Sequence, residues 1–131
     1  MELFCIDTHS LIWYACGNTK KLGKKAFEIL KKCEEKNTTV ELIVPTLVVL
    51  EIFHFTLKRP DTKFADFLNA LSSMNASIVP FDEHVLKACY RLPKKLDIHD
   101  RVIAATAIVY ECPLVTKDEI LKDLVLPKVV W

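Results

Sequence analysis

The apolar run Leu3-Phe4-Cys5-Ile6 ends abruptly on Asp7, and this stretch constrains the fold more than any other. A continuous apolar run of this length, followed by polar residues and then a helical pattern, is typical of a strand that is covered on both faces. Such strands occur in parallel sheets flanked by helices, and ligands bind beyond the carboxyl ends of those strands. The run therefore predicts a central strand that delivers the Asp7 carboxylate to a cleft.

The remainder of the chain alternates short strand patterns with helical patterns. Further strands are expected over residues 41–44, 76–79, 114–116 and, at an edge, 128–131. Helices are expected in between, with Thr8 or Ser10, Thr46, and Asp61 as caps of three of them. This rhythm predicts an α/β three-layer sandwich with a mostly parallel central sheet of four to five strands.

Composition limits the size and the cofactor class of the protein. The 131 residues, 51% of them hydrophobic, are enough for one domain, residues 1–131, with a substantial core. Only two glycines occur, so neither a glycine-rich phosphate loop nor a dinucleotide fingerprint can be built. Five cysteines without a C-x-x-C pair indicate small buried hydrophobes in a reducing compartment.

No segment has the pattern of a membrane span or a signal peptide. The longest apolar region, residues 42–50, is interrupted by Pro45 and is far shorter than the roughly 20 residues that cross a bilayer. The N-terminus lacks a basic region, and Asp7 interrupts the only apolar stretch near it. We therefore expect a soluble cytoplasmic protein. Its net charge of +1 leaves nucleic-acid binding to local basic patches.

Four acids stand at positions that suit one cation site. Asp7 and Asp118 follow expected strands, Glu51 lies inside an apolar helical run, and Asp100 opens an alanine-rich helix. Carboxylates that meet in one cleft repel one another unless a cation neutralises them. Because these ligands are hard oxygens, Mg²⁺ or Mn²⁺ is favoured over Zn²⁺.

Each acid also has a simpler interpretation. Asp7 and Asp118 occupy places where an aspartate commonly caps a helix, and Asp97 with Asp100 has the spacing of a capping pair. Glu51 can belong to a solvated helix stripe. The four histidines lack zinc-site spacing, so a surface or structural role is the simplest interpretation, although His9 and His99 lie close in sequence to the acids.

With these residues in view, the chain resembles the PIN-domain family, specifically the small VapC-like ribonuclease toxins. The resemblance spans nearly the whole length. Its specific part is the pair of blocks Leu96-Asp97-Ile98-His99-Asp100-Arg101-Val102-Ile103-Ala104-Ala105-Thr106-Ala107 and Pro113-Leu114-Val115-Thr116-Lys117-Asp118. Ile6-Asp7-Thr8-His9, Leu11-Ile12-Trp13 and the segment from Pro45 to Glu51-Ile52 add to it. Ile98 departs from the pattern, because proline is frequent at that place.

The resemblance implies an Mg²⁺- or Mn²⁺-dependent endoribonuclease, a hydrolase acting on RNA phosphodiester bonds, and the toxin of a type II toxin–antitoxin pair. Asp7, Glu51, Asp100 and Asp118 match the acidic quartet that holds the metal and is catalytic. Thr116 matches the hydroxyl residue that supports the last acid, Thr8 matches a supporting polar neighbour of the first acid, and Asp97 is at most an accessory acid. The family also implies a cognate antitoxin and a homodimer, which we expect to form through exposed apolar residues on helices such as the one that bears Phe64 and Phe67.

An acidic pocket needs basic groups at its rim to attract RNA. Lys58, Arg59, Arg101 and Lys117 are weak candidates for this role, and Arg101 can instead pair with an acid.

Two other classes of function remain open. A receiver-like signalling domain would need an acid at the end of the third strand, where Val79-Pro80 stands. A non-catalytic Mg²⁺-binding interaction domain is the other.

Overall fold

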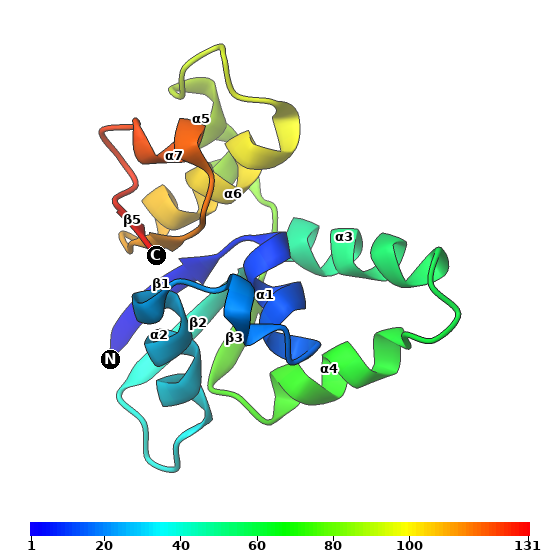
Figure 1. Cartoon of the computed structure of the whole chain (residues 1–131). Helices are drawn as coiled ribbons and strands as arrows, with labels where there is room; N and C mark the ends of the chain where they lie inside the picture. The colour runs from blue at the N-terminus through cyan, green and yellow to red at the C-terminus, as the bar shows by residue number, and fades with distance from the viewer.

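A computed structural model describes residues 1–131, and its centre is a sheet of five parallel strands in the order β3-β2-β1-β4-β5 (Figure 1). The strands are β1 (Glu2–Ile6), β2 (Val40–Pro45), β3 (Ala76–Val79), β4 (Leu114–Val115) and β5 (Val129–Val130). The expected α/β fold, the parallel sheet and its edge strand at the end of the chain are thereby confirmed.

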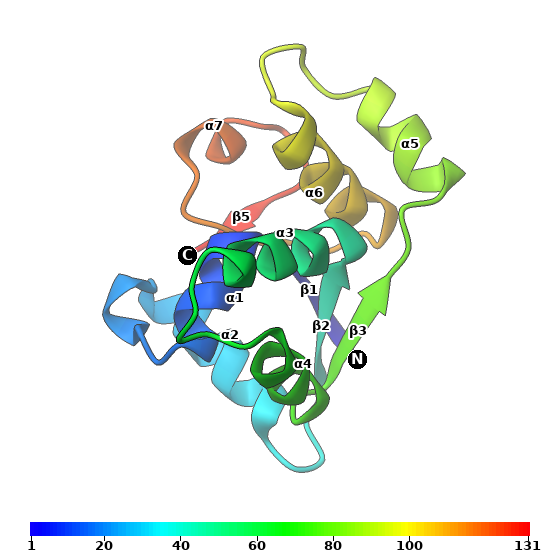
Figure 2. The ribbon, with the colours of Figure 1, turned by 90° about the vertical axis from the view of Figure 1, so that its right-hand side faces the viewer.

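Helices cover both faces of this sheet. They are α1 (Thr8–Ala15), α2 (Lys24–Glu34), α3 (Thr46–Leu57), α4 (Phe64–Ser72), α5 (Glu83–Tyr90), α6 (Ile98–Val109) and α7 (Glu119–Lys122), with a 3₁₀ turn at Thr19–Lys21. Figures 1 and 2 show α5 and α6 together on one side of the sheet and α1, α2 and α4 on the other. None of these helices has the length and apolar content that a membrane crossing needs.

Strand β1 is the centre of the core because it has a neighbour on each side. Its Cys5 aligns with Ile43 of β2 and with Leu114 of β4. Cys5 and Ile6 are fully buried, as a strand between two helical layers requires. The polypeptide leaves this buried position at Asp7, so the carboxylate emerges at the carboxyl edge of the sheet.

Several expected helix caps are wrong. Asp7, not Thr8 or Ser10, caps α1, because its side chain accepts a hydrogen bond from Ser10 N. Thr46 lies inside the first turn of α3, and its hydroxyl donates to Val79 O of β3 at 2.5 Å, which ties the helix start to the sheet. Asp61 does not cap α4, because that helix begins only at Phe64.

The two phenylalanines of α4, the helix expected to offer exposed apolar residues to a dimer, pack within the monomer. Phe67 is buried, and its ring packs edge-on against Phe55 of α3 at a centroid distance of 6.3 Å. Phe64 packs in the same manner against Phe53 at 5.2 Å. These aromatic pairs join α3 to α4, so the two rings contribute to the packing of the monomer. Four of the five cysteines are buried as expected, and Cys16 is exposed.

Candidate active site

A cleft of about 580 Å³ opens at the carboxyl edge of the sheet, and all four acids of the expected quartet line it. Asp7 follows β1, Asp118 follows β4, Asp100 lies in the first turn of α6, and Glu51 lies in α3. The full lining is Asp7, Thr8, His9, Trp13, Glu51, Asp97, His99, Asp100, Lys117 and Asp118. The fold thus brings side chains that are more than a hundred residues apart in sequence into one cavity.

Asp7 is held from two sides. Its Oδ1 accepts a hydrogen bond from Ser10 N at 3.0 Å, the contact that caps α1. Its Oδ2 accepts a hydrogen bond from the hydroxyl of Thr116. Thr116 is fully buried, and its Oγ1 also accepts a hydrogen bond from Asp118 N at 3.1 Å. This hydroxyl therefore links the loops that follow β1 and β4.

Glu51 reaches the cleft from the middle of α3. Its Oε1 accepts a hydrogen bond from Thr8 Oγ1 at 2.8 Å, and its Oε2 lies 3.0 Å from His99 Nδ1. Because a carboxylate accepts, His99 donates from Nδ1. Both oxygens of Glu51 are thereby oriented by side chains from other helices.

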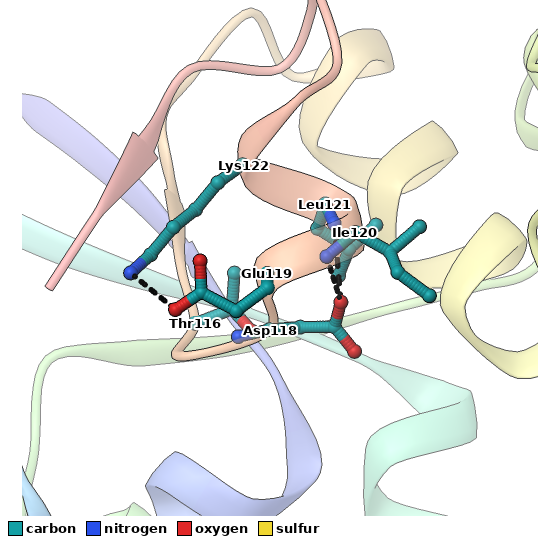
Figure 3. A network of polar contacts seen from close by, with 6 residues as sticks. All are labelled: Thr116, Asp118, Glu119, Ile120, Leu121 and Lys122. Carbon is teal, nitrogen blue, oxygen red and sulfur yellow. Dashed lines mark hydrogen bonds and ion pairs between the residues drawn. The ribbon is translucent and has the colours of Figure 1, made fainter.

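Asp118 and Asp97 each begin a helix. The Oδ1 atom of Asp118 accepts hydrogen bonds from Ile120 N at 2.8 Å and Leu121 N at 3.1 Å, and Figure 3 shows this cap. Asp97 caps α6 by accepting from Asp100 N at 2.8 Å. The simpler interpretation of these two acids as helix caps is thus correct, and they line the cleft as well.

Asp100 differs from the other acids, because no hydrogen bond to its carboxylate is formed in the structure. Burial raises the pKa of its carboxyl from 3.8 to about 6, with further contributions from the negative charge of Asp97 and of the other cleft carboxylates. Like charges in one cleft disfavour the ionised form of each carboxyl group. A cation or a proton in the cleft would relieve this repulsion.

The side chains suit a divalent cation in type, but they are not arranged around one. The cleft offers carboxylate oxygens and no thiol, a donor set typical of Mg²⁺ or Mn²⁺. No group of three or more His, Cys, Asp or Glu side chains encloses a metal-binding point in this arrangement. Asp7 and Glu51 accept hydrogen bonds at both of their carboxylate oxygens, whereas the carboxylate of Asp100 and the second oxygen of Asp118 accept none. Each carboxylate oxygen has two lone pairs, so the oxygens of Asp7 and Glu51 keep the capacity to bind a cation.

Of the basic residues expected near RNA, only Lys117 lines the cleft. Arg59 lies over the ring of Phe55 at 4.0 Å, and neither it nor Lys58 at the end of α3 reaches the acids. Arg101 neither lines the cleft nor pairs with an acid. Its guanidinium donates to four carbonyls, those of Cys89, Leu92, Pro93 and Leu96, at 2.7 to 3.1 Å. The guanidinium of Arg101 is thus engaged inside the protein, and its expected contact with RNA stays a prediction.

Three cleft residues were not expected from the sequence as functional residues. His99 contacts Glu51, and His9 and Trp13 form one wall of the cleft. Metal-ligand spacing gave no signal for the histidines, because neither belongs to an H-x-x-x-H pair. The signal that was available is position: His99 immediately precedes Asp100, and His9 and Trp13 are four residues apart on the helix that begins at Asp7.

Comparisons with known proteins agree with this fold. The family model described as PIN domain matches residues 4–125. No curated protein matches the sequence significantly.

Solved structures with low sequence identity share the architecture. A structure of VapBC2 from Rickettsia felis bound to a promoter DNA fragment superposes with a TM-score of 0.73 at 14% identity, covering 98% of this chain and 97% of that one. A toxin–antitoxin complex from Klebsiella pneumoniae gives 0.71 at 21% identity, with coverages of 100% and 97%. VapBC-5 from Mycobacterium tuberculosis gives 0.64 at 20% identity, with coverages of 99% and 97%.

Proposed function

Because this chain belongs to the PIN-domain family, we propose that it is a metal-dependent endoribonuclease that hydrolyses phosphodiester bonds in RNA. One observation carries the proposal. Asp7, Glu51, Asp100 and Asp118, which come from four separate elements, line one cleft at the carboxyl edge of a parallel sheet. Asp7 and Asp118 also cap helices, but Glu51 and Asp100 cap none, so helix capping does not account for all four acids. Their mutual repulsion is the property that cation binding would use.

In this proposal the four acids hold one or two Mg²⁺ or Mn²⁺ ions. Asp100 and Asp118 supply the available oxygens, and Asp7 and Glu51 supply oxygens that Thr116, Thr8 and His99 already orient. When bound, a divalent cation lowers the pKa of water and offsets the charge of the phosphodiester.

The chain's own residues do the remaining work. One of the four carboxylates accepts the proton of the attacking water. Lys117 lies at the cleft, where its ammonium group attracts a phosphate. Thr116 keeps Asp7 and the Asp118 loop in register, so that the two acids at the strand ends face the same phosphate.

We further propose that the chain is the toxin of a type II toxin–antitoxin pair. Support comes from the solved structures that share its fold, which include VapBC proteins and a toxin–antitoxin complex. A cognate antitoxin would cover the acid cleft with a helix, and a basic side chain of that helix would neutralise the carboxylates. Homodimerisation is part of the same proposal. Co-purification with the product of the neighbouring reading frame would test the pairing.

Cleavage of a labelled single-stranded RNA in Mg²⁺ or Mn²⁺ tests the nuclease proposal. Asp7→Asn and Asp100→Asn should each abolish cleavage while circular dichroism shows an intact fold. Asp61→Asn is the matched control, because it removes one exposed carboxylate outside the cleft. Cleavage that persists in both cleft variants would assign the activity to another site or to a contaminant.

Metal binding gives a second readout that needs no substrate. Mg²⁺ should raise the melting temperature of the unmodified protein, because an ion that binds only the native state stabilises it. The rise should be much smaller in Asp100→Asn. A melting temperature that does not change across the titration would contradict a cation site in the cleft.

A further inference from the structure

The cleft also has an aromatic part, formed by His9 and Trp13 beside the acids. His9 and Trp13 both project from α1, one turn apart on the same face, and their ring centroids are 5.9 Å apart with an interplanar angle of 42°. Trp13 is partly exposed, and it is the only hydrophobic side chain that lines the cleft. An apolar ring left open beside a cluster of carboxylates has no role in neutralising or holding a cation.

The position of Trp13 is fixed from outside the cleft. The ring of Trp131 meets it edge-on at a centroid distance of 6.1 Å. Trp131 in turn lies directly against Gly23, where a Cβ atom would stand 2.6 Å from Trp131 Cδ1. Close approach at a glycine therefore allows the edge-to-face contact of the two tryptophans, which holds the Trp13 ring from the side away from the cleft.

A positive charge accompanies this surface. Lys21, in the 3₁₀ turn after α1, places its Nζ 5.7 Å from the centre of the Trp13 ring. No acid pairs with Lys21 in the structure. An aromatic ring with an unpaired lysine beside it is the combination with which proteins bind single-stranded nucleic acid, the ring stacking on a base and the lysine contacting the backbone.

We propose that Trp13, flanked by His9, stacks on an unpaired nucleobase of the RNA substrate next to the phosphate held at the acids, and that Lys21 contacts the adjoining backbone. The inference rests on the proposed ribonuclease function, which it deepens by naming the substrate as single-stranded at the cleavage point. In a duplex the base faces are already stacked on one another, so the ring can act only on a base that is free.

A binding experiment without metal isolates this contact. Fluorescence polarisation of a labelled single-stranded RNA decamer in EDTA buffer measures affinity without cleavage. Trp13→Ala should weaken binding about 5- to 100-fold, the range for loss of one base–aromatic stack. Trp13→Phe should retain most of the affinity, because it keeps an aromatic face. Tyr90→Ala is the matched control, because it removes an exposed aromatic ring at the end of α5 that does not line the cleft.

Abasic RNA separates stacking from a structural effect. For a decamer that carries ribose without bases, the unmodified protein and Trp13→Ala should bind with equal affinity. Lys21→Gln should weaken binding of the intact and the abasic decamer alike, since a backbone contact does not involve the base. If Trp13→Ala weakens binding of both decamers equally, or if duplex RNA binds as well as single strands, the stacking role is overturned.

The two proposals fail in different ways. Binding that depends on Trp13 without metal-dependent cleavage would remove the nuclease proposal and with it the stated position of the base beside a scissile phosphate. Cleavage that is abolished by Asp7→Asn but unaffected by Trp13→Ala, in both rate and KM, would remove the stacking inference alone.

Discussion

Thr116 donates its hydroxyl hydrogen bond to the carboxylate of Asp7, although 109 residues separate the two along the chain. The same oxygen accepts the backbone N–H of Asp118. One buried side chain thus joins the ends of the two neighbouring strands β1 and β4, each of which carries an acid into the cleft. The sequence resemblance related Thr116 to the last acid only, whereas the structure ties it to the first acid as well.

Replacing Thr116 by valine should destabilise the protein and disturb the cleft together. The change keeps the side-chain shape but leaves the Asp118 N–H unpaired and removes one donor from Asp7, a loss of about 1 to 3 kcal/mol in the free energy of unfolding. Urea denaturation measures this loss. Thr116→Ser keeps the hydroxyl and should remain near the parent. A loss in Thr116→Ser as large as that in Thr116→Val would show that the methyl group contributes as much as the hydrogen bonds.

The raised pKa of Asp100 predicts how stability changes with pH. Between pH 3.8 and about 6 the folded protein holds a proton on this carboxyl that the unfolded chain has released. The free energy of unfolding therefore falls as pH rises through this window, and the deficit persists above pH 6. Asp100→Asn removes the charge, so in metal-free buffer it should melt at a higher temperature than the parent at pH 7.5 and at nearly the same temperature at pH 4.

Asp66→Asn provides the reference for this comparison, because Asp66 lies on α4 outside the cleft. Its melting temperature relative to the parent should not depend on pH in the same way. A gain from Asp100→Asn that is identical at pH 4 and pH 7.5 would show that the amide packs better, and that carboxylate repulsion is not the cause.

The sequence predicts the strands of this protein better than the hydrogen-bond partners of its side chains. An unbroken apolar run ending at Asp7 identifies the central strand without any knowledge of its neighbours, because burial on both faces leaves that pattern. The caps expected at Thr46 and Asp61 were wrong because a hydroxyl or carboxylate before a helical pattern has several possible partners. In the fold, Thr46 donates across to Val79 O, which lies 33 residues further along the chain.

Arg101, next to the candidate site, is a second residue whose hydrogen-bond partners the sequence does not predict. Adjacent to an acid of the quartet, an arginine is expected to contact a phosphate or a carboxylate. Its actual partners are carbonyls at the end of α5 and in the following loop, which become acceptors only once that helix has ended. Local sequence does not indicate where those carbonyls point.

Arg101→Lys should therefore lower stability even though it preserves the charge. A lysine cannot span four carbonyls, because its ammonium group lacks the planar fork of a guanidinium. We expect a loss of about 2 to 4 kcal/mol in the free energy of unfolding, measured in urea. Arg91→Lys is the matched control, since Arg91 is exposed at the end of α5. Unchanged stability with weaker, less salt-dependent RNA binding would instead make Arg101 a phosphate contact.

Gly23→Ala should displace Trp131 and lower the free energy of unfolding by about 1 to 3 kcal/mol, the usual range for overpacking. Gly23 has an ordinary backbone conformation (φ −66°), so the cost arises from the close approach of Trp131. An added Cβ would stand too close to the backbone carbonyl carbon of Trp131 and 2.6 Å from its Cδ1. Replacing Trp131 by alanine removes the ring contact and keeps the backbone contact, so the cost should shrink only in part, a coupling that a double-mutant cycle measures. Gly17→Ala is the contrasting case: its site is open and its φ is +73°, so its cost should be the same with or without the Trp131 ring.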